Sequence, residues 1–208
     1  MLSAYKNYLS LYLILVSSIC INAEENPYIF IDSNAQQMVS VLTENSDLFN
    51  SDRESYENKI KEIFEPMIDF RRVAASVMGK KYYLLSTKTQ RADFVEIFKD
   101  SLLDTYAETL AQWGDSTIST HFLDDQIDYE IKNIEVKQTL NTGSSQYPIS
   151  YKLRKNDGEW KIVNIIINGV NLGLTFRNQF QALAISNNED IESTLNNWVS
   201  DAGDAGIS

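Results

Sequence analysis

The first half of the chain has apolar residues at helical spacing. They are Tyr28, Ile31, Ala35, Met38, Val39 and Leu42 in one segment, and Tyr56, Ile60, Ile63 and Phe64 in the next. Steps of three and four residues place each set on one face of a helix. Ser51 and Glu54 have the spacing of a capping box, so they predict the start of the second helix, which Pro66 is expected to end. A third helix is expected from about Phe70 to Met78, with Gly79 as its left-handed C-terminal cap.

The longest predicted helix runs from Thr87 to about Trp113. Gln90 stands three residues after Thr87 and completes a second capping box. The apolar stripe of this helix consists of Phe94, Ile97, Phe98, Leu102, Tyr106 and Leu110, and Gly114 follows its end. The length of this stripe makes it the strongest helical signal in the chain.

A period of two replaces the helical pattern in the next part of the chain. It predicts strands at residues 117–122, 127–140, 147–154 and 159–167, and the second changes phase near Lys132 and Asn133, which indicates a bulge or break. Residues 155–158 read Lys-Asn-Asp-Gly, a strong hairpin turn. The run from Ile162 to Ile167 is apolar on both faces, so we expect this strand to be covered on both sides. Two further helices are expected at 174–185 and 189–199, before a loose tail at 201–208.

This order of elements predicts an α+β fold. We expect an antiparallel sheet of about four strands, packed with several helices on one side. A sheet facing helices can enclose a ligand cavity or a solid core, and apolar content alone favours the solid core.

The first residues have the pattern of a secretory signal peptide. Lys6 precedes an apolar run from Leu9 to Ile21, which is too short to span a bilayer and ends near the small residue Ala23. Cleavage after Ala23 would leave a single domain at residues 24–208 without cysteine. The alternatives are a retained anchor and a lipoprotein signal at Cys20, although Ile19 stands where lipid attachment requires a small residue.

The acidic balance of the chain argues against several classes of partner. The net charge is −11, and removal of Lys6 with the signal peptide makes it −12. We recognise no cluster of Lys and Arg that would neutralise phosphates, which predicts no binding to nucleic acid. Adsorption to anionic membranes is disfavoured for the same reason. Contact with lipid would then depend on apolar shape or on a protein partner.

Candidate catalytic and metal-binding residues are few. His121 is the single histidine, two residues before Leu123-Asp124-Asp125, and no serine or cysteine stands near it as a nucleophile. Asp124, Asp125 and Asp128 lack the glycine and the glutamate of a calcium loop. Residues 168–173, Asn-Gly-Val-Asn-Leu-Gly, lack the lysine and spacing of a phosphate loop, so tight turns are the simpler interpretation. We predict no catalytic residue, no metal and no cofactor.

With these segments in place, the chain resembles the MlaC family of periplasmic phospholipid-binding proteins of the Mla transport system, also called toluene-tolerance auxiliary proteins. Four blocks carry the resemblance: residues 68–79 followed by Tyr82 and Tyr83; residues 90–106; residues 153–172 around Trp160; and residues 176–180. The chain departs from the family at Asn164, where an aspartate is usual, at Asn168 and Asn171, where Glu and Ser are usual, and at Lys88, where a proline often opens the long helix. The loss of charge puts in doubt any headgroup or partner contact that those acids would make.

The resemblance implies a periplasmic carrier with a deep apolar pocket in a cone-shaped fold of the nuclear-transport-factor type. Such a carrier would move phospholipid between an outer-membrane lipoprotein complex and an inner-membrane ATP-driven transporter, and so maintain outer-membrane lipid asymmetry. We expect a monomer without stable membrane insertion. The pocket candidates are Val73, Val77, Phe94, Phe98, Leu102, Tyr106, Tyr151, Leu153, Ile162, Ile166, Val170, Leu172 and Phe176, each of which could instead pack in a solid core. Trp160 is assigned to the core. The alternatives are an adaptor with a filled core and an isomerase-like enzyme on a similar fold.

Overall fold

The computed structural model of the chain describes residues 26–111, 116–123 and 130–201, so the predicted signal peptide lies outside the described residues. Its helices are α1 (Pro27–Glu44), α2 (Leu48–Ser51), α3 (Arg53–Met67), α4 (Phe70–Leu85), α5 (Lys88–Ala111), α6 (Leu172–Ser186) and α7 (Ile191–Asn196). Its strands are β1 (Thr117–Thr120), β2 (Asn133–Asn141), β3 (Gln146–Asn156), β4 (Glu159–Ile167) and β5 (Val170–Asn171). None of the helices in this part of the chain is both long enough and apolar enough to cross a membrane.

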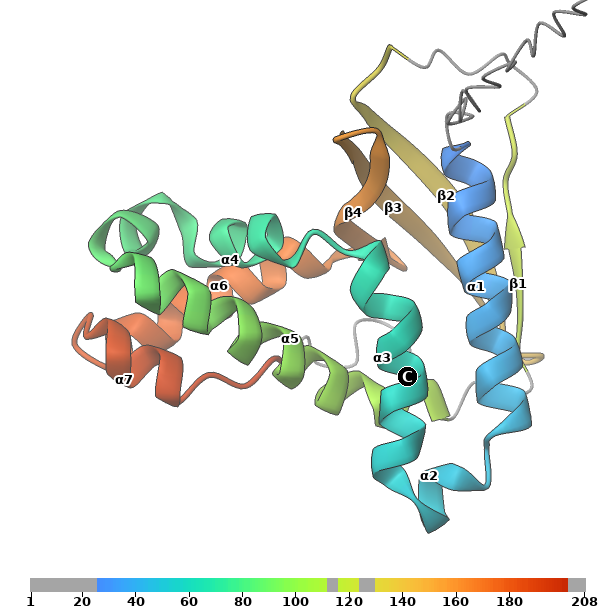
Figure 1. Cartoon of the computed structure of the whole chain (residues 1–208), viewed down its shortest axis with the longest axis horizontal. Helices are drawn as coiled ribbons and strands as arrows, with labels where there is room; N and C mark the ends of the chain where they lie inside the picture. Colours follow the sequence, from blue (N-terminus) through green and yellow to red (C-terminus); the bar gives the residue numbers. More distant parts are fainter. Residues whose placement is uncertain (1–25, 112–115, 124–129, 202–208) are drawn as a thin grey trace, which may run out of the picture.

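The α+β class with an antiparallel sheet is confirmed. The strands pair in the order β1-β2-β3-β4-β5, and every pairing of neighbours is antiparallel. The sheet has five strands instead of about four, because the chain returns after β4 as the two-residue strand β5. Helices α1, α3, α4 and α6 contact the sheet, while α5 packs on α3 and α4, and α7 packs on α5 and α6 (Figure 1).

Side-chain caps decide where several helices begin. The capping box of α5 is confirmed, since Thr87 N donates to Gln90 Oε1 over 2.9 Å and Gln90 N donates to Thr87 Oγ1 over 3.1 Å. The predicted box at Ser51 and Glu54 is wrong. Asp52 caps α3 through a 3.1 Å bond from Ser55 N, and Ser51 instead ends the short helix α2. The carboxylate of Asp52, one residue after Ser51, thus caps the free N–H groups at the start of α3 in place of the Ser51 hydroxyl.

Two further helix ends were predicted, at Pro66 and at Gly79. Pro66 lies inside the last turn of α3, which continues to Met67. The helix that begins at Phe70 does end at Gly79, as predicted, because α4 consists of two helical segments that meet there at a kink, and the second segment continues to Leu85. The backbone of Gly79 has φ 68° and ψ 166°, a conformation that is open almost only to glycine. The kink turns the second half of α4 into a new direction.

Tight turns join the last strands, as the sequence predicted. Asp157 (φ 51°) and Gly158 (φ 89°) form the hairpin between β3 and β4, and Asn168 (φ 47°) and Gly169 (φ 83°) form the next one. Positive φ at both central residues matches the twist of the strands. Strand β2 begins only at Asn133, next to the predicted break; residues 130–132 are not in a strand, and 127–129 lie outside the described residues.

A β-bulge in β4 changes which side chains face the helices. Leu153 pairs with Ile162 and Lys152 pairs with Asn164, so Val163 is the extra residue. Before the bulge Trp160 and Ile162 enter the core, and after it Ile165 and Ile167 do so. Ile166 therefore lies on the other face, where it is half-buried. The prediction that both faces of this strand are covered is correct only for the helix-facing side.

The core of the helical layer is an aromatic cluster. Phe94 lies edge-on to Phe180, with ring centroids 4.9 Å apart, and edge-on to Trp198, with centroids 5.5 Å apart. Phe98 contacts Phe176 in the same way, over 5.5 Å. Trp160 is fully buried at the sheet, which confirms its assignment to the core. These rings join α5, α6 and the end of the chain into one layer.

Candidate functional site

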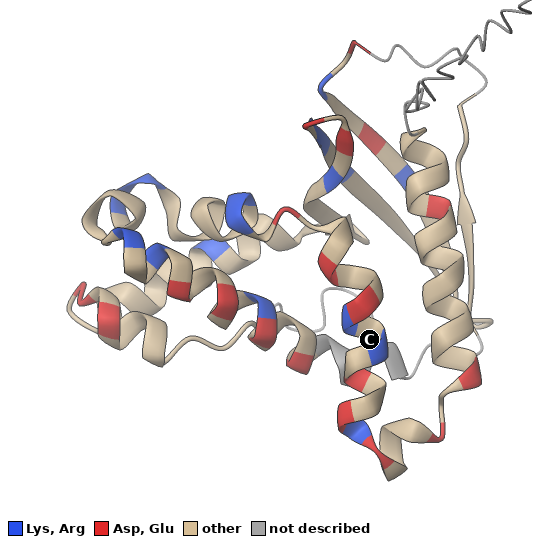
Figure 2. Ribbon diagram, viewed as in Figure 1, with Lys and Arg blue, Asp and Glu red and all other residues tan. Residues whose placement is uncertain are grey.

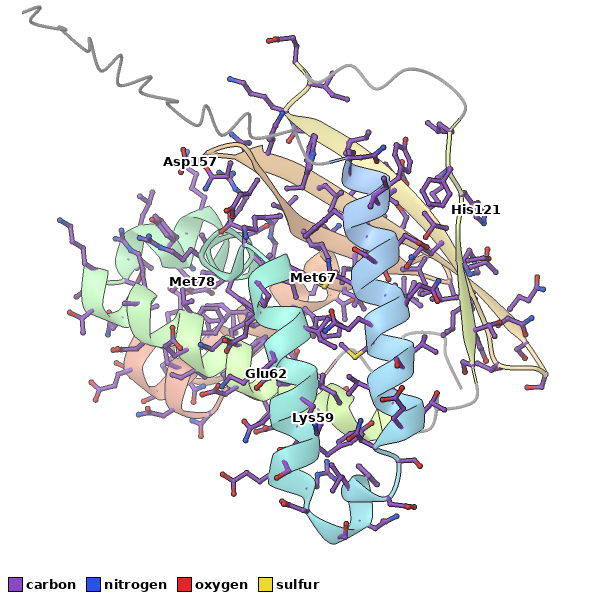
Figure 3. All side chains as sticks on the ribbon, turned by 45° about the vertical axis from the view of Figure 1, so that its right-hand side comes forward. Lys59, Glu62, Met67, Met78, His121 and Asp157 are labelled. Carbon is purple, nitrogen blue, oxygen red and sulfur yellow. The ribbon has the colours of Figure 1, made fainter. Side chains whose placement is uncertain are left out.

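An apolar cavity lies between the first helices and the sheet. It has a volume of about 80 Å³ and is lined by residues of α1, α3 and the strands. Its lining residues are Ile31, Asn34, Ala35, Met38, Val39, Leu42, Phe64, Met67, Ser116, Ile118, Leu140, Ile149, Tyr151 and Ile162. Figure 3 shows Met67 at the end of α3, next to the sheet. We call this space the first cavity.

Polar groups in the wall of the first cavity are few. They belong to Asn34, Ser116 and Tyr151, and Asn34 Nδ2 is already bonded to the carbonyl of Phe30 over 2.7 Å. Burial raises the pKa of Tyr151 well above its ordinary value, because the apolar surroundings disfavour the phenolate. Tyr151 therefore stays a neutral phenol that can offer one O–H to a ligand in an otherwise apolar space.

A second apolar cavity lies beside the first, between β4 and the helical layer. Its volume is about 50 Å³, and its wall comes from the α3–α4 junction, α4, α5, β4 and the start of α6. The lining residues are Ile68, Val73, Phe98, Leu102, Ile162, Asn164, Ile165, Leu172, Gly173 and Phe176. Asn164 supplies the polar side chain of this wall.

Ile162 belongs to both cavities and lies at the boundary between them. The backbone beside it is fixed: Asp69 N donates to the carbonyl of Ile162 over 3.0 Å, and Ile68 forms an isolated parallel bridge with Ile162. The junction between α3 and α4 therefore crosses the strand at this point.

The structure distributes the predicted pocket residues over three kinds of position. Val73, Phe98, Leu102, Ile162, Leu172 and Phe176 line the second cavity, and Tyr151 with Ile162 lines the first. Val77, Phe94 and Leu153 are fully buried in the core and line neither of these cavities. Ile166 and Val170 are half-buried outside both walls, and the side chain of Tyr106 lies outside the described residues.

Sequence reasoning missed the contribution of α1. Ile31, Ala35 and Met38 line the first cavity, although their apolar stripe was recognised only as a helix signal. The sequence carried no sign of which element the stripe would face, because contacts between α1 and the strands join residues about a hundred positions apart.

Of the polar candidates, the structure describes His121. His121 is exposed just beyond β1, and its Nε2 lies 2.9 Å from Thr139 Oγ1 (Figure 3). Asp124, Asp125 and Asp128 lie outside the described residues. Across the described ranges, no group of three or more His, Cys, Asp and Glu side chains is placed to hold a metal ion.

Comparison with known proteins shows the family to which the chain belongs. The model of the family described as MlaC protein matches residues 32–200, most of the chain. The chain belongs to the MlaC family. A curated relative, the toluene tolerance protein ttg2D of Pseudomonas putida, is 28% identical over 185 residues, which cover 88% of this chain and 84% of the relative.

Two further similar proteins have a lower sequence identity to this chain. The intermembrane phospholipid transport system binding protein MlaC of Haemophilus influenzae is 22% identical over 187 residues, covering 89% of this MlaC-family chain and 78% of the relative. The solved structure of a phospholipid-binding protein from Ralstonia solanacearum, in complex with a phospholipid, superposes with a TM-score of 0.73 at 20% identity. The alignment covers 83% of this chain and 94% of that one, so the two share a fold.

Proposed function

We propose that this MlaC-family protein is a phospholipid carrier that holds acyl chains between its sheet and its helices. The observation that carries the proposal is the pair of apolar cavities that meet at Ile162. Support also comes from the relatives, one of which is named for phospholipid transport, and from the related fold that was solved with a phospholipid.

The cavities are too small to hold a phospholipid as they stand. Their volumes are about 80 and about 50 Å³, whereas pockets for small molecules usually enclose roughly 300–1,000 Å³. We infer that lipid entry requires the helices to move away from the sheet, so that the two spaces merge past Ile162. Most side chains in the two walls are apolar, so they can slide past one another. The bonds that join α1 to β1, from Gln36 Nε2 to the carbonyl of Ile118 and from Thr120 Oγ1 to Asp32 Oδ1, would have to break or move with the helix.

A carrier of this kind needs no catalytic group. Burying two acyl chains with roughly 30 methylenes is favourable by roughly 24 kcal/mol relative to water. Lipid would therefore not escape into an aqueous compartment. Relative to a bilayer the same contribution nearly cancels, since both surroundings are hydrocarbon, so release to an acceptor can occur without chemistry.

The finer parts of the proposal concern place and partners. We propose that residues 1–23 direct export and that the mature protein works in the periplasm. There it would exchange lipid with an outer-membrane lipoprotein complex and an inner-membrane ATP-driven transporter, and so maintain outer-membrane lipid asymmetry. Energy for net transport would come from the partners, because the chain offers no nucleotide-binding loop.

Solvent extraction tests the central proposal. The full chain would be expressed in a Gram-negative host, and the protein purified from the periplasm without detergent, extracted and analysed by mass spectrometry. We expect phospholipid in at least equimolar amount. An unrelated periplasmic protein of similar size, purified in parallel, measures the lipid carried over by the procedure. A yield no higher than this control would reject the carrier and favour an adaptor with a filled core.

A further inference from the structure

Basic residues are concentrated in one stretch of this acidic protein. Residues 70–92 contain six of the 18 Lys and Arg residues and no Asp or Glu, in a chain of net charge −11. The six residues are Arg71, Arg72, Lys80, Lys81, Lys88 and Arg91, and we call them the basic end. Helical spacing spreads these residues along the chain, so they do not form a run of bases in the sequence.

The fold brings these residues together on α4 and the first turn of α5. Arg71, Arg72, Lys80 and Tyr83 line one open surface hollow, and the guanidinium of Arg91 stacks over the Tyr83 ring at 4.2 Å. Figure 2 shows blue segments along α4 and at the start of α5, while the red segments of this half of the molecule lie further along α5 and at α7. The helix kink at Gly79 contributes, because it turns Lys80 and Lys81 away from the axis of the first half of α4.

Nearby carboxylates neutralise only part of this charge. Asp69 pairs with Arg72 over 3.4 Å, and Glu189 pairs with Lys81. Arg71, Lys80 and Lys88 are exposed and form no ion pair with any residue in the part of the chain that the structure describes. Asp93, which is also exposed, is the first acidic residue along α5. The basic end therefore keeps uncompensated positive charge at its surface.

Two leucines protrude from the same end. Leu84 is 66% exposed and Leu85 is 58% exposed, at the last turn of α4 and directly before Ser86 and Thr87. Lys81 precedes the pair and Lys88 follows it. Adjacent exposed leucines flanked by lysines are costly in water but favourable at the boundary between lipid headgroups and acyl chains.

We propose that the basic end docks on the surface of an anionic phospholipid bilayer. Arg71, Lys80 and Lys88 would contact lipid phosphates, and Leu84 and Leu85 would enter the headgroup layer. The positive charge of the basic end could equally well bind an acidic protein surface. The exposed pair Leu84 and Leu85 favours a bilayer as the partner, because leucines can enter the headgroup layer. Docking depends on surface charge and exposure and not on the cavities, so it can hold or fail independently of lipid carriage.

Sedimentation with vesicles tests the proposal. The purified protein would be mixed with vesicles made of equal parts phosphatidylglycerol and phosphatidylcholine, or of phosphatidylcholine alone. We expect binding to the first only, weakening as salt is added. The triple variant Arg71→Gln, Lys80→Gln, Lys88→Gln should lose about fivefold in affinity per charge, or roughly a hundredfold in total.

A matched control variant distinguishes the contribution of the basic end from the effect of the protein's net charge. Lys59→Gln, Lys132→Gln, Lys137→Gln removes the same charge from exposed positions on α3, before β2 and on β2 (Lys59 is labelled in Figure 3). This variant should lose far less affinity than the first triple variant. An equal loss in both variants would overturn the proposal, because general charge would then explain the binding.

The leucines are tested by the double variant Leu84→Ser, Leu85→Ser. We expect it to bind several-fold more weakly with an unchanged salt dependence, while Ile29→Ser, at a position 57% exposed on α1, should bind normally. Unaltered binding of the leucine variant would contradict entry into the headgroup layer. If the intact protein fails to bind the anionic vesicles at low salt, docking on bilayers is rejected and an acidic protein surface becomes the better partner.

Discussion

The side chain of Asn164 donates a hydrogen bond from Nδ2 to Oδ1 of Asn171, over 3.0 Å. Its own Oδ1 accepts from Gly173 N, also over 3.0 Å, and Asn171 Oδ1 caps α6 by accepting from Leu174 N. One amide thus connects β4 to the first turn of α6, at the wall of the second cavity. A carboxylate at position 164 could accept but not donate, so the two asparagines that depart from the usual family pattern act here as a pair.

Asn164→Ala should destabilise the protein by about 1–3 kcal/mol, because it leaves Gly173 N and part of Asn171 without a partner in a partly buried site. Urea unfolding followed by circular dichroism measures this change. Asn178→Ala, on the exposed side of α6, is the control and should stay within about 0.5 kcal/mol of the parent. Equal stability of Asn164→Ala and the control would show that the bonds do not connect β4 to α6.

Gly173→Ala should also destabilise the protein, by about 1–3 kcal/mol, because a Cβ atom there would lie 2.6 Å from Asn164 Oδ1. The same contact predicts coupling between the two sites. In the double variant Asn164→Ala, Gly173→Ala, the obstructing oxygen is absent, so the combined loss should be smaller than the sum of the single losses. Additive losses would argue against this contact.

Ile165 and Ile166 provide a matched pair for the proposed lipid site. Ile165 lines the second cavity, whereas Ile166 lies on the opposite face of β4 because of the bulge at Val163. Ile165→Trp should fill the space and lower the extracted phospholipid severalfold, and Ile166→Trp should retain it. Circular dichroism would check that both variants fold. Equal lipid content in two folded variants would place the acyl chains away from the second cavity.

Tyr56 is fully buried on α3, and its hydroxyl has no hydrogen-bond partner among the described residues. Burial raises the pKa of Tyr56 to about 12, and the charge of Arg53 opposes this only in part. The unfolded chain releases this proton near pH 10, so stability should fall as the pH rises from about 10 to 12, where the folded protein still retains the proton.

Tyr56→Phe should remove the loss of stability at alkaline pH that comes from Tyr56. At neutral pH the variant should be as stable as the parent or more stable by about 1 kcal/mol. Unfolding in urea over a series of pH values measures both effects. Some decrease should remain in the variant, because burial also raises the pKa of Tyr151. A variant that loses stability at neutral pH would indicate that the hydroxyl has a partner.

By itself, the sequence determined the local structure wherever a short-range interaction decides it. The capping box at Thr87 and Gln90, the turn at Asp157 and Gly158 and the amphipathic helices follow from residues within a few positions of one another. The order of these elements was sufficient for the α+β class, and four sequence blocks were sufficient for the MlaC family.

Only the tertiary structure decided which side chains meet. The continuous apolar run from Ile162 to Ile167 conceals the bulge, so the sequence could not tell that Ile165 would face the helices and Ile166 would not. The first cavity depends on α1 packing over β1 and β2. The basic end depends on the direction in which the chain continues as a helix after Gly79, which the sequence does not reveal. Such contacts join residues far apart along the chain, and their geometry is set by close packing of the whole core.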